Sequence, residues 1–161
     1  MKNKIKIIYE DNHLLVCEKP VNMPVQADSS GDEDLLSTVK AYIKEKYSKP
    51  GEVYLGLVHR LDRPVGGVMV FARTSKAAAR LTESLKNRKT KKHYAAIVSG
   101  SPCSSAELEC DLLRDEQNNI SRVVRPNTPG AKTASLEYVS TVTKNGFTLL
   151  DVLLHTGRHH Q

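Results

Sequence analysis

The most informative stretch of the chain reads His59-Arg60-Leu61-Asp62-Arg63-Pro64-Val65-Gly66-Gly67, followed by the apolar run Val68-Met69-Val70-Phe71-Ala72. Residues 57–62 and 68–72 predict two strands, and the proline with the two glycines predicts a sharp turn between them. Asp62 then lies on a loop over a rigid scaffold. Cations on either side, Arg60 and Arg63, would keep its carboxylate ionised and able to act as nucleophile or general base. A surface Asp in a salt-bridged turn would explain the local spacing at least as well.

The remaining elements follow from periodicity. Residues 5–17 predict a hairpin that turns at Asp11-Asn12. Helical spacing runs from Asp32 and ends before Pro50, and Thr74 or Ser75 can cap a second helix. Beyond Thr90 the pattern predicts strands at 92–99, 106–113, 120–125, 132–139 and 147–154. Sequential strands with short connections favour antiparallel pairing, so the expected fold class is α+β, a mixed and largely antiparallel sheet with packed helices.

Composition sets the class of protein. A chain of 161 residues is long enough for one domain with a real core, and we expect a single domain over 1–161. Three cysteines without a C-x-x-C pair, and no secretory leader, favour a reducing cytoplasm. No apolar run approaches membrane length. We therefore expect a soluble cytoplasmic monomer without a membrane partner.

Positive charge is concentrated around Asp62. Between Leu57 and Lys92 ten Lys or Arg stand against two acids, a local charge of +8 that exceeds the +6 of the whole chain. Phosphate contacts supply much of the affinity of nucleic-acid enzymes, so this block suits a polyanionic substrate. A solvated helix face is the commoner explanation of a basic run. The candidates for RNA backbone contacts are Lys86, Arg88, Lys89, Lys91 and Lys92.

From His59 to Gly67 the chain resembles the H-R-L-D-x-x-x-x-G signature of RluA-type pseudouridine synthases. Three further stretches resemble that family in the same order: residues 8–25 with Lys19-Pro20, residues 92–100 with Tyr94, and residues 156–161 with Arg158. The resemblance implies the pseudouridine synthase catalytic fold and an isomerase that converts uridine to pseudouridine in ribosomal or transfer RNA, without cofactor or metal. Gly66 departs from the family, which often has Ser there, and we expect only a looser turn.

The resemblance also implies roles for single residues. Asp62 would be catalytic, either attacking ribose carbon 1 or removing a proton from ribose carbon 2. Arg60 would enter the RNA stack in place of a flipped nucleotide, although it could simply neutralise Asp62, since alternate residues of a strand share one face. Tyr94 would stack on the uracil with its hydroxyl near Asp62, and Arg158 would contact substrate. As ordinary residues, Tyr94 would be core and Arg158 surface.

Other functions remain open at this stage. A catalytically silent RNA-binding module would keep the same basic face and would tolerate loss of Asp62. A hydrolase using Asp62 as nucleophile is disfavoured because no carboxylate cluster for Mg²⁺ accompanies it. The histidines 155, 159 and 160 follow a strand, with no partner at metal-ligand spacing, so we expect no metal site. The expected partner is structured RNA and not DNA.

In the family the stretch at residues 156–161 continues with an apolar residue and a second Arg. The chain is therefore expected to lack the C-terminal part of the catalytic domain and to carry no separate RNA-binding domain. An exposed sheet edge and a missing cation near Asp62 would then leave it with weak RNA binding and with poor or no turnover.

Overall fold

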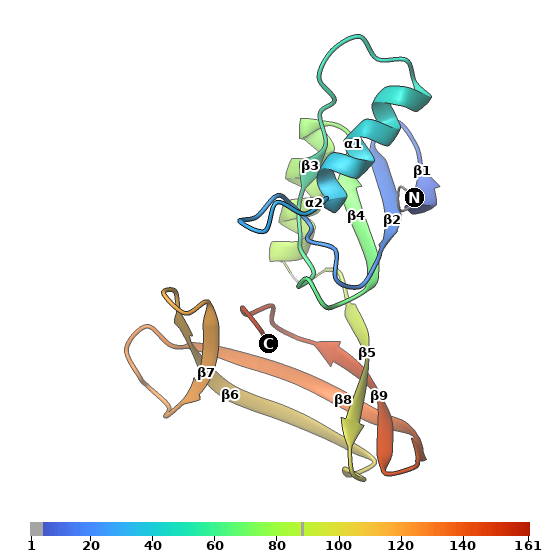
Figure 1. The fold of residues 1–161 in the computed structure, drawn as a ribbon. Helices are drawn as coiled ribbons and strands as arrows, with labels where there is room; N and C mark the ends of the chain where they lie inside the picture. Colours follow the sequence, from blue (N-terminus) through green and yellow to red (C-terminus); the bar gives the residue numbers. More distant parts are fainter. Residues whose placement is uncertain (1–4, 88) are drawn as a thin grey trace. The chain divides into compact units, whose positions relative to one another are not determined.

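A computed structural model describes residues 5–87 and 89–161 (Figure 1). Contacts divide the chain into two compact units, Met1–Asn87 and Arg88–Gln161, called here the N-terminal and the C-terminal unit. The expectation of a single domain stays a prediction.

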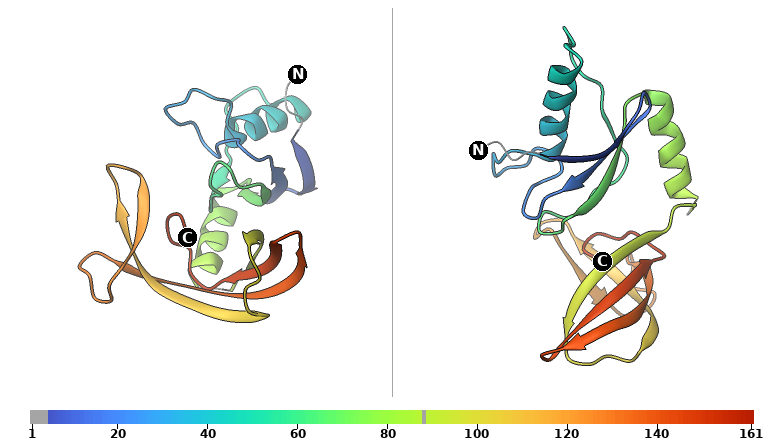
Figure 2. Two further views of the ribbon diagram at one scale, coloured as in Figure 1. Left: turned by 60° about the horizontal axis from the view of Figure 1, so that its bottom comes forward. Right: turned by 90° about the vertical axis from the view of Figure 1, so that its right-hand side faces the viewer.

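The N-terminal unit is a four-stranded antiparallel sheet with one helix on each face (Figure 2). Its strand order is β1-β2-β4-β3. The elements in chain order are β1 (Lys6–Glu10), β2 (Leu14–Lys19), α1 (Leu35–Lys46), β3 (Gly56–Leu57), β4 (Gly67–Ala72) and α2 (Ser75–Lys86). The predicted hairpin, both helices and the strand at 68–72 are confirmed.

The main core of this unit lies between the sheet and α1. Leu15 pairs with Phe71 across β2 and β4, and all three α1 residues that face them, Leu35, Val39 and Ile43, are buried. Their spacing of four residues places them on one side of the helix. Each helix begins at a side-chain cap, and the cap of α2 is Thr74, one of the two residues expected there. The Asp34 carboxylate accepts from the Ser37 N–H, and the Thr74 hydroxyl accepts from the Ala77 N–H.

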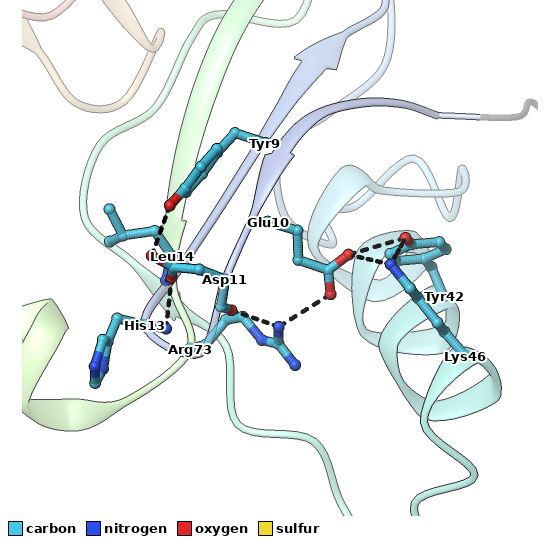
Figure 3. Close-up of polar contacts among 8 residues, drawn as sticks. All are labelled: Tyr9, Glu10, Asp11, His13, Leu14, Tyr42, Lys46 and Arg73. Carbon is cyan, nitrogen blue, oxygen red and sulfur yellow. Dashed lines mark hydrogen bonds and ion pairs between the residues drawn. The ribbon is translucent and has the colours of Figure 1, made fainter.

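A buried carboxylate joins three elements at the end of β1 (Figure 3). Glu10 accepts from Arg73 Nη1 (3.0 Å), Tyr42 Oη (3.0 Å) and Lys46 Nζ (2.7 Å). Its side chain is only 6% exposed, so the partners replace the water it loses. Burial alone would raise the pKa of Glu10, but hydrogen bonds from Lys46 and two tyrosines outweigh it and lower that pKa.

The strand predicted at 57–62 is wrong beyond its first residue. β3 ends at Leu57, and residues 58–66 form a loop. Beyond the pair of Leu57 and Phe71, β4 forms a hydrogen bond to a side chain: the Val70 N–H donates to His59 Nε2 at 3.1 Å. A ring nitrogen here takes the place of a backbone carbonyl. The expectation that Arg60 and Asp62 share a strand face therefore has no basis.

The C-terminal unit is a five-stranded antiparallel sheet in the order β5-β9-β8-β6-β7. Its strands are β5 (Lys92–Ser99), β6 (Ser105–Asp115), β7 (Ile120–Val124), β8 (Lys132–Lys144) and β9 (Phe147–Leu154). The five predicted strands are confirmed, with β8 continuing past residue 139 through an irregularity between Ser140 and Val142. The α+β class is confirmed, and the described strands form two sheets.

The C-terminal unit has both buried and strongly exposed apolar side chains. Leu150, Val152 and Ala134 are buried in the C-terminal unit, whereas Ile97 is 74% exposed and pairs with Leu149, which is also exposed. Among the described residues no helix is long and apolar enough to cross a membrane.

Candidate active site

Asp62 lies in the loop between β3 and β4, residues 58–66, which is called here the Asp62 turn. Asp62 closes it through its backbone, because its carbonyl accepts from the Val65 N–H at 3.0 Å. Its side chain is exposed, as is that of Arg60. The loop thus presents a carboxylate to solvent from a short hydrogen-bonded turn, which suits a group that must meet a substrate.

Lys19, the last residue of β2, holds this turn through hydrogen bonds to its backbone carbonyls. Its side chain is 1% exposed, and Nζ donates to three backbone carbonyls, of Pro20 (3.0 Å), Arg63 (3.0 Å) and Val65 (2.7 Å). All three donors of the ammonium are therefore satisfied. Burial lowers the pKa of Lys19, the charge of Asp62 opposes that shift, and Arg63 adds to it. Lys19 holds the turn and places a positive charge close to Asp62.

Arg63 does not serve Asp62 as the sequence led us to expect. Its guanidinium lies against a loop that precedes α1, where Nη1 donates to Ser30 Oγ at 3.1 Å and lies 3.9 Å from Asp28 Oδ2. Nη2 pairs with Asp32. The hydrogen bond and charge of Arg63 lower the pKa of Asp32. The arginine next to the candidate catalytic residue is thus bound by carboxylates from another part of the unit.

Two glycines complete the turn in different ways. Gly67 has φ +146°, a conformation that side chains strongly disfavour, although a Cβ there would have space. Gly66 has no positive φ, and a Cβ there would lie 3.1 Å from Val21 Cγ1 and 3.4 Å from the Lys19 carbonyl. The turn therefore requires glycine at 67 for its backbone conformation, whereas at 66 the tightest contact of a Cβ would be with the Val21 side chain.

Tyr94 and Arg158 belong to the C-terminal unit. Tyr94 is half-buried on β5, and Arg158 lies in the segment that follows β9. Because Lys92 pairs with Leu154, the start of β5 and the end of β9 lie at one end of the sheet. Arg158 Nε donates to the Thr133 carbonyl at 2.8 Å, which aims its side chain along β8.

The Thr156-Gly157-Arg158-His159-His160-Gln161 segment closes on itself. Gln161 Oε1 accepts from Thr156 Oγ1 (2.7 Å) and from the Arg158 N–H (3.0 Å), while its amide nitrogen donates to the Ser135 carbonyl (3.1 Å). His159 contacts Ser121 Oγ at 3.0 Å on β7. These bonds hold the Arg158 backbone against β8 and explain why a Gln belongs in the motif.

The five basic candidates differ in their surroundings. Lys86 ends α2, and it is exposed, like Lys89 and Lys91. Lys92 is half-buried, and its Nζ donates to the Thr156 carbonyl at 3.0 Å. Arg88 lies outside the described residues. Three candidates are thus open to solvent, and Lys92 also supports the Arg158 segment.

The site residues divide between the two units. Asp62, Arg60 and Lys86 belong to the N-terminal unit and the others to the C-terminal unit. The expected closeness of the Tyr94 hydroxyl to Asp62 stays a prediction.

Sequence reasoning missed Lys19, the Asp28–Asp32 loop and Gln161 as supports. Lys19-Pro20 and Gln161 stood in the quoted motifs, so only the role was missing. In the part of the chain that is described, no three His, Cys, Asp or Glu side chains gather as for a metal.

Comparisons with known proteins identify relatives of this chain. The sequence model of RNA pseudouridylate synthase matches residues 13–161. Ribosomal large subunit pseudouridine synthase D of Zymomonas mobilis is 31% identical over 159 residues, covering 98% of this chain and 50% of that protein. An uncharacterized RNA pseudouridine synthase of Aquifex aeolicus is 34% identical over 163 residues, with the same two coverages. The chain spans about half the length of these curated relatives.

A solved structure shares the fold. Human RNA pseudouridylate synthase domain containing 4 aligns with a TM-score of 0.81 at 24% identity, over 97% of this chain and 61% of that chain. This likeness shows the fold alone. The family match spans the Asp62 turn, the Tyr94 strand and the Arg158 segment together. This chain therefore belongs to the RNA pseudouridylate synthase family, which confirms its resemblance to the RluA-type enzymes.

Proposed function

We propose that this chain carries the uridine-isomerising centre of an RNA pseudouridine synthase, with Asp62 as its catalytic residue. The observation that supports this most is the Asp62 turn itself. An exposed carboxylate stands on a turn whose carbonyls are clamped by a buried lysine, inside a segment that the family model covers. A preorganised group of this kind meets a substrate without the cost of ordering a loop.

The reaction breaks the bond between ribose carbon 1 and uracil nitrogen 1, then forms a bond from the same ribose carbon to uracil carbon 5. Carbon 5 loses its proton to solvent, and nitrogen 1 gains one. Asp62 would assist the cleavage, as nucleophile at ribose carbon 1 or as base at ribose carbon 2. The Lys19 ammonium, held by its three carbonyls, places a positive charge near this carboxylate.

The substrate we propose is structured RNA. Two features support it: the exposed Lys86, Lys89 and Lys91, which lie between Asp62 and Tyr94 in the sequence, and relatives named for the ribosomal large subunit. Ribosomal RNA is the first substrate to test and transfer RNA the second. We propose Arg60, Tyr94 and Arg158 as substrate contacts, and a cytoplasmic monomer as the working form.

The test uses RNA labelled with tritium at uracil carbon 5, because isomerisation must release that hydrogen to water. Wild-type protein should release tritium, and Asp62→Asn should release none while its RNA affinity stays within about threefold, since the change removes a charge used in chemistry. Glu52→Gln has the same charge change on an exposed residue of the same unit and should behave as wild type. Substantial release by Asp62→Asn would refute the assignment.

A further inference from the structure

Arg63 is held at both its backbone and its side chain. Its carbonyl accepts from the buried Lys19 ammonium at 3.0 Å, and the following Pro64 restricts its backbone conformation. Its guanidinium is bound by residues 28–32, called here the acidic loop. The residue after Asp62 is therefore constrained at its backbone and at its side chain.

The acidic loop is ordered by its own hydrogen bonds as well as by Arg63. Asp28 Oδ1 accepts from the Ser30 N–H at 2.9 Å, Asp32 N–H donates to Ser30 Oγ at 3.2 Å, and Gly31 adopts φ +73° at the bend. The base of the loop is closed, because Leu35 N–H donates to the Pro24 carbonyl at 2.9 Å next to α1. The loop thus offers Arg63 a fixed attachment point instead of a mobile one.

Charge also favours this attachment over a phosphate. Two carboxylates and one guanidinium leave the cluster with one net negative charge. A phosphate that approached Arg63 would be repelled by the cluster and would have to displace carboxylates held on the same chain. A basic residue in this motif would ordinarily be assigned to RNA binding. Its observed partners indicate another role.

We propose that Arg63 is a positioning residue, which fixes the Asp62 turn by binding the acidic loop and does not bind an RNA phosphate. The turn hydrogen bond from Val65 N–H to the Asp62 carbonyl spans Arg63 and Pro64, so release of the Arg63 side chain lets this bond open. An open turn misplaces the Asp62 carboxylate, and a displacement of about 1 Å can lower a rate about a hundredfold. This inference rests on the proposed function for its catalytic part only.

Two variants break the Arg63 attachment from opposite sides. Arg63→Gln removes the cation, and the double variant Asp28→Asn with Asp32→Asn removes its partners. Asn at 28 keeps an oxygen for the Ser30 N–H, so the loop can retain its turn. The matched control is Glu45→Gln with Glu52→Gln, which removes two exposed carboxylates of the same unit that pair with no described residue.

Each protein is measured in three ways: exchange of the Val65 amide by NMR without RNA, RNA affinity against salt, and turnover on tritiated RNA. Both attachment-breaking variants should speed Val65 exchange and lower kcat, each by about tenfold or more, with the RNA dissociation constant within about twofold of the control. Amides of Leu15 and Phe71 in the core should exchange at the wild-type rate. Arg63→Lys keeps the positive charge but lacks the planar guanidinium that binds two partners at once, so its Val65 amide should exchange at a rate between those of wild type and Arg63→Gln.

A phosphate-binding Arg63 makes the two variants diverge. Arg63→Gln would then weaken RNA binding and lower the salt slope by about 0.7 to 0.9, while the double Asn variant would bind RNA more tightly than its control. Unchanged Val65 exchange in both variants would also overturn the proposal. Faster Val65 exchange in the variants, with no tritium release by the wild type, would refute the proposed function and support the positioning role of Arg63.

Discussion

Single residues of the Asp62 turn are constrained by different forces. Gly67 is required because of its backbone conformation, with φ +146°, whereas Gly66 has an ordinary φ and meets Val21, an exposed side chain that can move. Gly66 therefore affects the turn through the unfolded chain as well as the folded one. A glycine loses more conformational freedom on folding than any other residue, so it raises the entropy cost of forming the turn.

A pair of substitutions separates these two cases. Gly67→Ala should destabilise the protein by about 1 to 3 kcal/mol, because alanine is strained at that φ. Gly66→Ala should change stability by less than about 1 kcal/mol, because the reduced entropy of the unfolded chain offsets a close approach that Val21 can relieve. Urea denaturation of both variants measures the difference. Equal destabilisation would show that packing, and not backbone conformation, decides the requirement at 67.

Elements of the N-terminal unit are joined by the Glu10 network. It links β1 to α1 through Tyr42 and Lys46, and to the segment before α2 through Arg73, which also lies 4.7 Å above the Tyr47 ring. The hydrophobic core packs α1 against the sheet, and the hydrogen bonds of Glu10 add a directional constraint on the position of the helix. The buried carboxylate specifies one position, because only there are its partners in reach.

Glu10→Gln should lower stability by about 2 to 3 kcal/mol, since the amide nitrogen faces cationic donors that it cannot accept from. The folded pKa of Glu10 lies below its ordinary value. Its contribution is therefore fully present above the unfolded pKa and is lost as pH falls through the folded pKa. The difference in melting temperature between the two proteins should shrink as the pH falls from 7 to 3. Glu18→Gln, at the exposed pair with Lys6, is the control and should cost less than about 1 kcal/mol. A constant gap across this pH range would contradict the role of the ionised carboxylate.

At the scale of the whole molecule, charge bears on RNA binding. The basic residues lie on both sides of the boundary between the two units in the sequence, with Lys86 near the end of the N-terminal unit and Lys89 and Lys91 near the start of the C-terminal unit. Lys92 differs from them because it donates to the Thr156 carbonyl. An exposed lysine can give its charge to a phosphate, whereas one bound to a carbonyl also holds its own fold together.

Changing Lys86, Lys89 and Lys91 together to Gln should weaken RNA binding and reduce the salt slope by about 0.7 to 0.9 for each phosphate that the protein no longer binds. Stability should be unaffected. Lys92→Gln should instead lower the melting temperature, because the Thr156 carbonyl loses its donor. The triple variant of Lys40, Lys44 and Lys49 on and after α1 has the same charge change and is the control. An identical salt slope for the two triple variants would show that Lys86, Lys89 and Lys91 are solvated surface residues that do not contact RNA.

Much of the secondary structure could be predicted because its causes are local. The caps Asp34 and Thr74 each satisfy an N–H three residues away, and the strands at 92–99 and 147–154 follow an alternation visible within eight residues. The H-R-L-D signature and the motifs around it were enough to identify the family, because their order along the chain is itself the signal.

Tertiary structure decided what depends on partners far along the chain. Arg63 was expected to flank Asp62, yet it binds Asp32, thirty-one residues before it. Lys19 reaches carbonyls forty-four and forty-six residues away. The strand predicted at 57–62 ends at Leu57, and the His59 side chain accepts from the Val70 N–H instead. Sequence alone determined which residues could form each element and which family they belong to. Only the folded chain determined the partner of each charge, because a charge pairs with whatever the fold brings within a few ångströms, and local periodicity carries no information about that.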